Sequence, residues 1–180
     1  MKNKEIYDIV YSKNTEYNLP MEDKYHFIDE FIEGKGSILD VGCGQGNNLK
    51  RLFNSGCDIT GIEISEVCCN RYLSGYPHIN IGLSEYADCT IEVYDCLFCF
   101  DVLEHISYED LDIFLNSCKK LSKSVLFGIA NHSDIQFDIE LHIIQQDSNW
   151  WKEKLLQTFS IVDLIYNSSN FYIFEGKTND

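Results

Sequence analysis

An acidic residue followed by a run of glycines stands near residue 40. Residues 39–46 read Leu-Asp-Val-Gly-Cys-Gly-Gln-Gly and come directly after an apolar run at 37–41. Glycine adopts backbone conformations closed to other residues and lets a ligand approach the main chain closely. The string therefore predicts a strand, then a ligand-binding turn, then the start of a helix.

The glycine spacing bears on which ligand this turn binds. A dinucleotide-binding fingerprint from Gly42 requires glycine at position 47, where the chain has Asn47. The carboxylate of Asp40 would oppose a pyrophosphate and suits a cationic group better. An NAD-dependent oxidoreductase remains as an alternative.

A second acidic residue stands at the end of the next apolar run, 58–64. Glu63 lies about 20 residues after the glycine turn, where an acidic side chain can accept hydrogen bonds from both ribose hydroxyls. We expect Ile64, beside it, to pack on an adenine ring. Together the two motifs predict an adenosine-containing ligand.

A third motif follows the apolar run 94–100 and reads Asp101-Val-Leu-Glu104-His105. An imidazole titrates near neutral pH, so His105 can accept a proton from a substrate hydroxyl or amine; the alternative is a purely structural histidine. Asp101, Glu104 and His105, with His132 or His142, also have the donor types of a divalent-metal site. The spacing alone does not define a ligand set, and we predict no metal.

Apolar runs alternate with helical patterns through most of the chain. We predict strands at 37–41, 58–64, 78–82, 94–100 and 124–129, helices at 45–55, 65–73, 108–121 and 148–158, and a linker at 84–90. Such alternation indicates an α/β fold with a parallel sheet covered on both faces. The last apolar runs, 159–166 and 171–176, flank a polar turn and predict an antiparallel hairpin.

The predicted fold is therefore a doubly wound, Rossmann-like, mixed seven-strand sheet. We expect one domain over 1–180, with a helical lid segment at 1–33 and a catalytic core at 34–180. Tyr7, Tyr11 and Tyr17 form a lid over the pocket in one interpretation and pack the helix on the sheet in the other. Trp150 and Trp151 are expected to include at least one core anchor.

The glycine string and the Asp-Val-Leu-Glu-His segment together resemble the class I (Rossmann-like) S-adenosylmethionine-dependent methyltransferases that act on small molecules. The resemblance implies S-adenosyl-L-methionine as cofactor, bound above the carboxyl ends of the strands. Ser84 and Glu85 are the candidates for the adenine contact that such enzymes place after the third strand. The implied cofactor-binding residues are Asp40, Gly42, Cys43, Gly44, Gly46, Glu63, Ile64, Ser84, Glu85, Phe100, Asp101 and Val102.

The resemblance also implies methyl transfer to oxygen or nitrogen of a small acceptor, with His105 as the candidate base. A sugar or surface-glycan precursor is the favoured acceptor. The substrate-side candidates are Tyr11, Asn131, His132 and His142. The alternative is a non-catalytic module that keeps this fold and acts as partner or regulator of another enzyme.

Composition restricts the partners. Twenty-nine acidic against fourteen basic residues give a formal charge of −15, which disfavours nucleic acid as a substrate. No apolar run approaches the roughly 20 residues that span a bilayer, so we expect a cytoplasmic protein.

The eight cysteines are expected to be free thiols. Cys96 and Cys99 should point to opposite faces of one strand.

Overall fold

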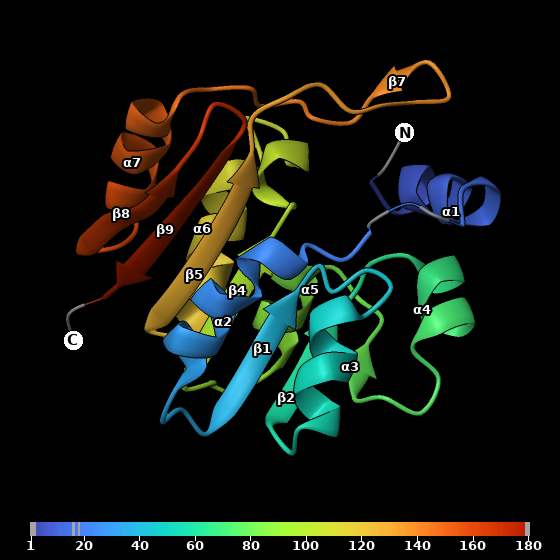
Figure 1. Ribbon diagram of the computed structural model, residues 1–180, viewed down its shortest axis with the longest axis horizontal. Coiled ribbons are helices and arrows are strands. Elements are labelled where there is room, and N and C mark those ends of the chain that lie inside the picture. Colours follow the sequence, from blue (N-terminus) through green and yellow to red (C-terminus); the bar gives the residue numbers. More distant parts are fainter. Residues whose placement is uncertain (1–2, 16, 18, 179–180) are drawn as a thin grey trace.

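The computed structural model describes residues 3–15, 17 and 19–178, and its centre is a seven-stranded sheet (Figure 1). The strand order is β3-β2-β1-β4-β5-β9-β8. The strands of this sheet are β1 (Ser37–Val41), β2 (Asp58–Ile62), β3 (His78–Ile79), β4 (Cys96–Phe100), β5 (Ser124–Ala130), β8 (Ile161–Asn167) and β9 (Phe171–Lys177).

The pairing within the sheet is mixed. The first five strands pair in parallel, whereas β9 lies antiparallel between β5 and β8. This arrangement confirms the predicted fold class, including the antiparallel pair at the end of the chain. The sequential order reverses between β1 and β4, and the crevice at such a switch point is where open α/β sheets bind their ligands.

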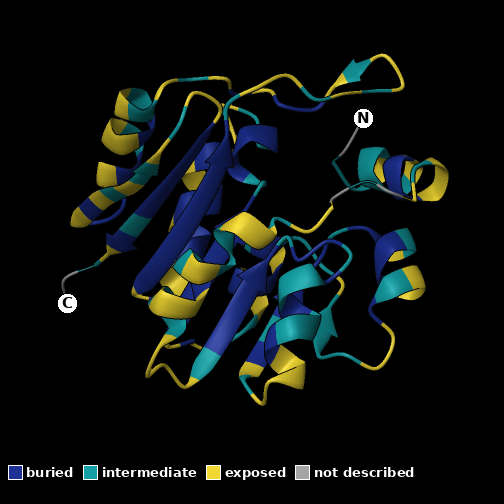
Figure 2. Cartoon of the chain, in the orientation of Figure 1, coloured by how far each residue is buried: buried dark blue, intermediate teal, exposed yellow. Residues whose placement is uncertain are grey.

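Helices cover both faces of the sheet, because its central strands are apolar on both sides (Figure 2). Along β4, Leu97 and Cys99 belong to one buried cluster, whereas Cys96 and Phe98 belong to the other. The two cysteines therefore do point to opposite faces, as predicted. The first cluster includes residues of α5 (Leu83–Cys89), α6 (Leu111–Leu121) and α7 (Ser148–Leu156), and the second includes residues of α2 (Tyr25–Ile32), α3 (Asn47–Asn54) and α4 (Glu66–Tyr72).

The predicted linker at 84–90 is wrong, since α5 occupies Leu83–Cys89. Leu83, Tyr86 and Ala87 are buried at helical spacing and pack into the first cluster. These three apolar residues span little more than one helical turn, and the other residues of α5 are mostly polar. The pattern is therefore too short to indicate a helix from the sequence.

A small hairpin is a second feature absent from the prediction. Strands β6 (Ile135–Gln136) and β7 (Ile139–Glu140) pair outside the main sheet, joined by a turn in which Phe137 and Asp138 have φ of 53° and 63°. Two positive φ values characterise a type I′ turn, for which glycine or asparagine is the usual sequence signal. Neither residue type occupies those positions. We call residues 131–142 the arm.

The N-terminal helix α1 (Asn3–Lys13) stands apart from the sheet and faces the arm (Figure 1). Of the predicted lid segment 1–33, residues 1–2, 16 and 18 lie outside the described residues. Two short 3-10 helices, η1 (Glu22–Lys24) and η2 (Leu103–His105), complete the described elements. No helix in the described part of the chain is long and apolar enough to cross a bilayer.

Candidate active site

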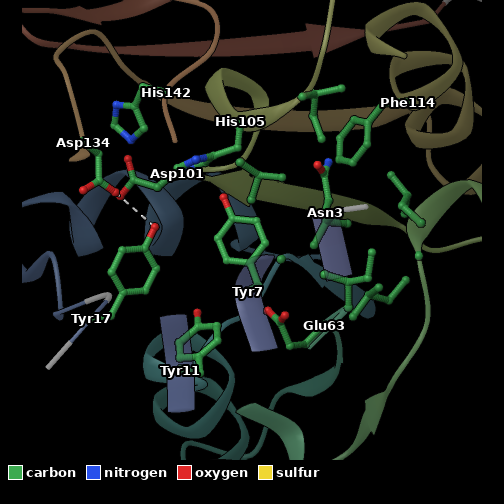
Figure 3. Close-up of a pocket in the computed structure, with 18 of the residues that line it drawn as sticks. Asn3, Tyr7, Tyr11, Tyr17, Glu63, Asp101, His105, Phe114, Asp134 and His142 are labelled. Atoms are coloured by element: carbon green, nitrogen blue, oxygen red, sulfur yellow. Dashed lines mark hydrogen bonds between the residues drawn. The ribbon is translucent and has the colours of Figure 1, made fainter. Parts of the chain in front are cut away.

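A cavity of about 260 Å³ lies at the carboxyl ends of β1, β2 and β4 (Figure 3). Its walls come from the core strands, from α1, from η2 and from the arm. Its lining residues include Tyr7, Tyr11, Tyr17, Gly42, Glu63, Ile64, Ile81, Gly82, Leu83, Asp101, Val102, His105, His132, Asp134 and His142. No lysine or arginine is among the described lining residues.

The glycine turn after β1 is built as the sequence predicts. Gly42 and Gly46 have φ of 68° and 78°, in the left-handed region that favours glycine. A Cβ on Gly42 would lie 2.3 Å from Cγ2 of Val102, so close packing also requires glycine there. Gly46 precedes α3 and serves as its N-cap residue. The turn thus places main chain, rather than side chains, at the floor of the cavity.

Glu63 faces the cavity from the end of β2, although only 5% of its surface is exposed. Its Oε2 accepts a hydrogen bond from the Gly44 N–H at 3.0 Å, and its Oε1 accepts one from the Ser65 N–H at 2.7 Å. Burial raises the pKa of Glu63 to about 7, and the hydrogen bonds from the main chain oppose that rise. Each oxygen has a further lone pair for a ribose hydroxyl.

Asp40 lies apart from this cavity. It lines a second, smaller cavity with Cys43 and Phe100, and Gly42 lies between the two. Burial raises the pKa of Asp40 to about 8, and its Oδ2 has no hydrogen-bond partner among the described residues. An acceptor left in this state is a place for a donor group of a ligand. Asp40 in the smaller cavity therefore fits its predicted role as the partner of a cationic group such as an ammonium, whose charge would favour the ionised carboxylate.

The apolar end of the cavity is formed by Ile64, Ile81 and Leu83. This surface suits the flat face of an adenine ring. Ser84 and Glu85, the predicted adenine contacts, do not line the cavity: Ser84 accepts a hydrogen bond from Ser117, and Glu85 is exposed. The predicted strand 78–82 is shorter in the structure, where β3 ends at Ile79, and Ile81 beyond its end lines the cavity.

The opposite end of the cavity is polar and acidic. Asp101 stands just after β4 with φ of 52°, an unusual conformation for a residue other than glycine and one that turns its side chain toward the cavity. Asp134 reaches it from the arm and accepts a hydrogen bond from the Tyr17 hydroxyl at 3.2 Å. Burial raises the pKa of Asp101 to about 6.

Three histidines lie beside these carboxyl groups. The ring of His105 is 4.5 Å from that of His142, and the ring of His132 is 4.8 Å from that of His142. The Nδ1 of His105 lies 3.0 Å from the carbonyl oxygen of Leu141, which can only accept, so Nδ1 carries the hydrogen. Burial lowers the pKa of His105 to about 3. Its Nε2 is then a free acceptor on a neutral ring.

The same residues could hold a metal. Glu104, His105 and His142 offer ligand atoms that lie within 4.8 Å of one another, and all three side chains are buried. Oε1 of Glu104 accepts a hydrogen bond from the Ala130 N–H, while Oε2 has no partner among the described residues. Imidazole and carboxylate together suit a first-row divalent cation. The sequence spacing did not define a metal site, whereas the structure brings three possible ligands together.

The N-terminal tyrosines both line the cavity and pack on their surroundings. Tyr7 meets the ring of His105 edge-on at 5.7 Å, and Tyr11 lies 5.6 Å from Tyr17. Because α1 stands apart from the sheet (Figure 1), the interpretation in which these tyrosines pack the helix on the sheet does not fit, whereas a position lining the cavity does. Asn131, a predicted substrate residue, is outside the cavity, because its amide donates to the hydroxyl of Tyr172 at 2.8 Å.

Comparisons with known proteins agree with this geometry. A family model described as "Methyltransferase domain" matches residues 13–161. The ubiquinone biosynthesis O-methyltransferase of Nitrosomonas europaea is 28% identical over 124 residues, which cover 61% of this chain and 51% of that protein. The corresponding enzyme of Hydrogenovibrio crunogenus is 34% identical over 92 residues, covering 46% and 38%. The chain spans about half, or less, of the length of these curated relatives.

Solved structures show the same fold. A SAM-dependent methyltransferase from Archaeoglobus fulgidus superposes with a TM-score of 0.73 at 15% identity, covering 98% of this chain and all of that one, 100%. Magnesium protoporphyrin IX methyltransferase from Synechocystis PCC 6803, solved with bound SAM, gives a TM-score of 0.69 at 14% identity, covering 99% and 98%.

The fold and the placement of the cavity define a class I, Rossmann-like methyltransferase, the class that the sequence motifs indicate. The family model covers most of the chain. The chain belongs to the methyltransferase-domain family, whose methyl donor is S-adenosylmethionine.

Proposed function

We propose that the protein transfers the methyl group of S-adenosylmethionine to an oxygen or nitrogen atom of a small acceptor. The observation that carries the proposal is the shared cavity, which joins the glycine turn and the buried carboxylate of Glu63 to the polar end at Asp101 and His105. Bound S-adenosylmethionine supplies an electrophilic methyl group on a sulfonium. The remaining tasks belong to the side chains and main chain around it.

One end of the cavity binds S-adenosylmethionine and orients its methyl group. Glu63 accepts hydrogen bonds from the ribose, while Ile64, Ile81 and Leu83 enclose the adenine. The free oxygen of Asp40 lies beside the glycine turn for the ammonium group. Positioning of this kind contributes much of the rate in a displacement that needs two groups in line.

The polar end is proposed to bind and orient the small molecule that receives the methyl group, because a histidine whose pKa is lowered to about 3 is too weak a base to take up its proton at neutral pH. The Nε2 of His105 has no hydrogen and faces the same cavity as Glu63, and the main-chain carbonyl of Leu141 fixes the ring. Tyr11, His132 and His142 line this cavity as well. The carboxyl groups of Asp101 and Asp134 accept hydrogen bonds from hydroxyl or amino groups of the acceptor.

We propose a hydroxyl-bearing acceptor, with a sugar or surface-glycan precursor favoured. The hydrogen-bond acceptors at the polar end support this class, because hydroxyl groups can donate to each of them. A hydroxylated aromatic acceptor is the second candidate. The two curated relatives described above are ubiquinone biosynthesis O-methyltransferases, and this favours it.

Two measurements test the function. Calorimetry should show binding of S-adenosylmethionine and S-adenosylhomocysteine. If NAD, rather than these two ligands, raises the thermal unfolding temperature, the protein would be an oxidoreductase. Incubation with methyl-labelled S-adenosylmethionine and a panel of sugars, nucleotide sugars and catechols should then label one acceptor class. Donor binding with no labelled product from cell extract would indicate the non-catalytic module.

A further inference from the structure

A chain of hydrogen bonds connects the N-terminal helix to the ribose carboxylate. Asp8, in the middle of α1, accepts through Oδ1 from the hydroxyl of Ser65 at 2.7 Å and from the N–H of Val67 at 3.2 Å. The N–H of Ser65 in turn donates to Oε1 of Glu63 at 2.7 Å. These hydrogen bonds thus join two distant segments, α1 and residues 63–67, with 57 positions between Asp8 and Ser65.

Within the part of the chain that the structure describes, Asp8 is the acceptor for the hydroxyl hydrogen of Ser65. Its Oγ caps α4 by accepting from the N–H of Cys68 at 3.1 Å, and the hydroxyl hydrogen goes to Asp8. Ser65 is fully buried, with 0% of its surface exposed. Loss of the Asp8 carboxylate would leave a buried donor without an acceptor, and the residue would have to shift to recover one.

Two further contacts between α1 and α4 lead away from Glu63. Arg71 donates to the carbonyl oxygen of Tyr11 at 2.6 Å, and Lys4 forms an exposed ion pair with Glu66 at 3.2 Å. These contacts hold the helix in place. Asp8 is a side chain of α1 whose hydrogen bond leads to Ser65, the residue that donates to the Glu63 carboxylate.

We propose that Asp8 is a positioning residue for the methyl donor: through Ser65 it orients the carboxylate of Glu63, so that docking of α1 and binding of the adenosine part of the donor favour each other. The proposal rests on the function proposed above, because it takes Glu63 as the ribose partner. Since coupling between two binding events is reciprocal, the donor must stabilise the docked helix by the same factor.

The contribution of Asp8 is geometric rather than electrostatic. A negative charge at Asp8 opposes ionisation of Glu63, although burial is the larger cause of the raised pKa of Glu63. A neutral side chain with an acceptor oxygen should therefore serve as well. This distinguishes Asp8→Asn, which keeps the acceptor, from Asp8→Ala, which removes it.

The first test measures binding of two ligands by calorimetry: S-adenosylhomocysteine, and 5′-methylthioadenosine, which keeps adenine and ribose but lacks the amino-acid part. We expect Asp8→Ala to weaken both by a similar factor of about ten, the size expected for a charged hydrogen bond in a buried network. Asp8→Asn should stay within about threefold of the wild type on the same scale. Lys4→Ala, on the same helix, is the matched control and should bind as the wild type does.

The second test asks whether Asp8 acts through Ser65. If it does, Asp8→Ala should add little to the effect of Ser65→Ala, and the two changes should be far from additive. Amide hydrogen exchange should show that S-adenosylhomocysteine protects residues 3–13 in the wild type and protects them less in Asp8→Ala. Asp8→Ser, too short to reach Ser65, replaces Asp8→Ala if that variant fails to fold.

Three results would overturn the proposal: wild-type affinity in Asp8→Ala, additive losses in the double variant, or loss of S-adenosylhomocysteine binding with 5′-methylthioadenosine unaffected. The last result would assign Asp8 to the wall around the amino-acid part instead. A wild-type protein that binds neither ligand would contradict the proposed function itself, and the two failures are therefore distinguishable.

Discussion

Glu63 and Asp40 are carboxyl groups kept in largely apolar surroundings at the ends of neighbouring strands. Burial raises the pKa of Glu63 to about 7 and that of Asp40 to about 8. Both values lie above the ordinary range, so the protonated forms persist to neutral pH. The ionised form of Glu63 is the stronger acceptor for ribose hydroxyls, and donor binding should depend on it.

We expect the affinity for S-adenosylhomocysteine to rise as the pH increases through about 7 and to fall below it, because Glu63 is then protonated. Calorimetry between pH 6 and 8.5 measures this. Asp40→Asn should keep the step near pH 7, whereas Glu63→Gln should remove that step and leave the one near pH 8 that Asp40 contributes. Glu63→Ala should bind poorly at every pH. An affinity that is flat across this range in the wild type would contradict the assignment.

His105 is expected to act on the acceptor rather than on the donor. Replacement by glutamine should lower kcat by about tenfold, the size of one misplaced hydrogen bond to the methyl acceptor, without changing donor affinity. His78→Gln, at a histidine on β3 outside the cavity, is the control. Unchanged kcat in His105→Gln would show that this histidine only holds the arm through Leu141.

The motifs predicted residues that the fold brings to one place. Gly42, Glu63, Asp101 and His105 line one cavity, as the strings around them suggest. The pairing of Tyr17 with Asp134 could not be predicted, because the two residues are 117 positions apart and neither belongs to a motif. Contacts of that range follow from the path of loops, which periodicity does not determine.

At the scale of elements, the arm contacts the end of α1 and the segment that follows it. These contacts lie over the polar end of the cavity, where the methyl acceptor is proposed to bind. Tyr17 donates to Asp134, Asn14 donates to Gln136 at 3.3 Å, and the ammonium of Lys13 lies 5.1 Å from the ring of Phe137. The contacts are few and partly exposed. Segments joined in this way open at low free-energy cost.

Tyr17→Phe should therefore increase the amide exchange of residues 131–142 and raise KM for the acceptor more than it lowers kcat. Exchange measured by mass spectrometry, together with initial rates, checks both effects. Tyr108→Phe removes a hydroxyl that accepts a hydrogen bond from Gln146 on the surface and is the control. Equal exchange in wild type and Tyr17→Phe would mean that the hydroxyl pair does not hold the arm.

The elements that the sequence missed share a physical cause. Helix α5 and strands β6 and β7 are short, and a two-residue strand has no measurable alternation. The apolar strands β4 and β5 and the helix α6 were predicted to within about three residues of their observed bounds, because each buries a continuous apolar surface.

At the scale of the whole molecule, the sheet is stabilised by two apolar layers, and α7 anchors the C-terminal strands to one of them. Trp151 is fully buried in the first cluster, whereas Trp150 is only partly buried against it. The sequence expectation that at least one tryptophan is a core anchor is thus confirmed for Trp151.

Trp151→Ala should lower the free energy of unfolding by about 3–5 kcal/mol, the range for removing a large aromatic side chain from a packed core. Trp150→Ala should cost clearly less, because part of its surface already faces water. Urea unfolding followed by circular dichroism gives both values. Equal losses in the two variants would contradict the different burial of the two rings.

The free thiols of the protein differ in their exposure to solvent. Of the eight cysteines, Cys43, Cys68, Cys69, Cys96, Cys99 and Cys118 are buried, Cys57 is partly exposed and Cys89 is exposed. A maleimide dye should therefore react first at Cys89 in the native protein. That residue ends α5, whose first residue, Leu83, lines the adenine end of the cavity. One exposed thiol thus offers a place for an optical reporter of donor binding without any change to the sequence.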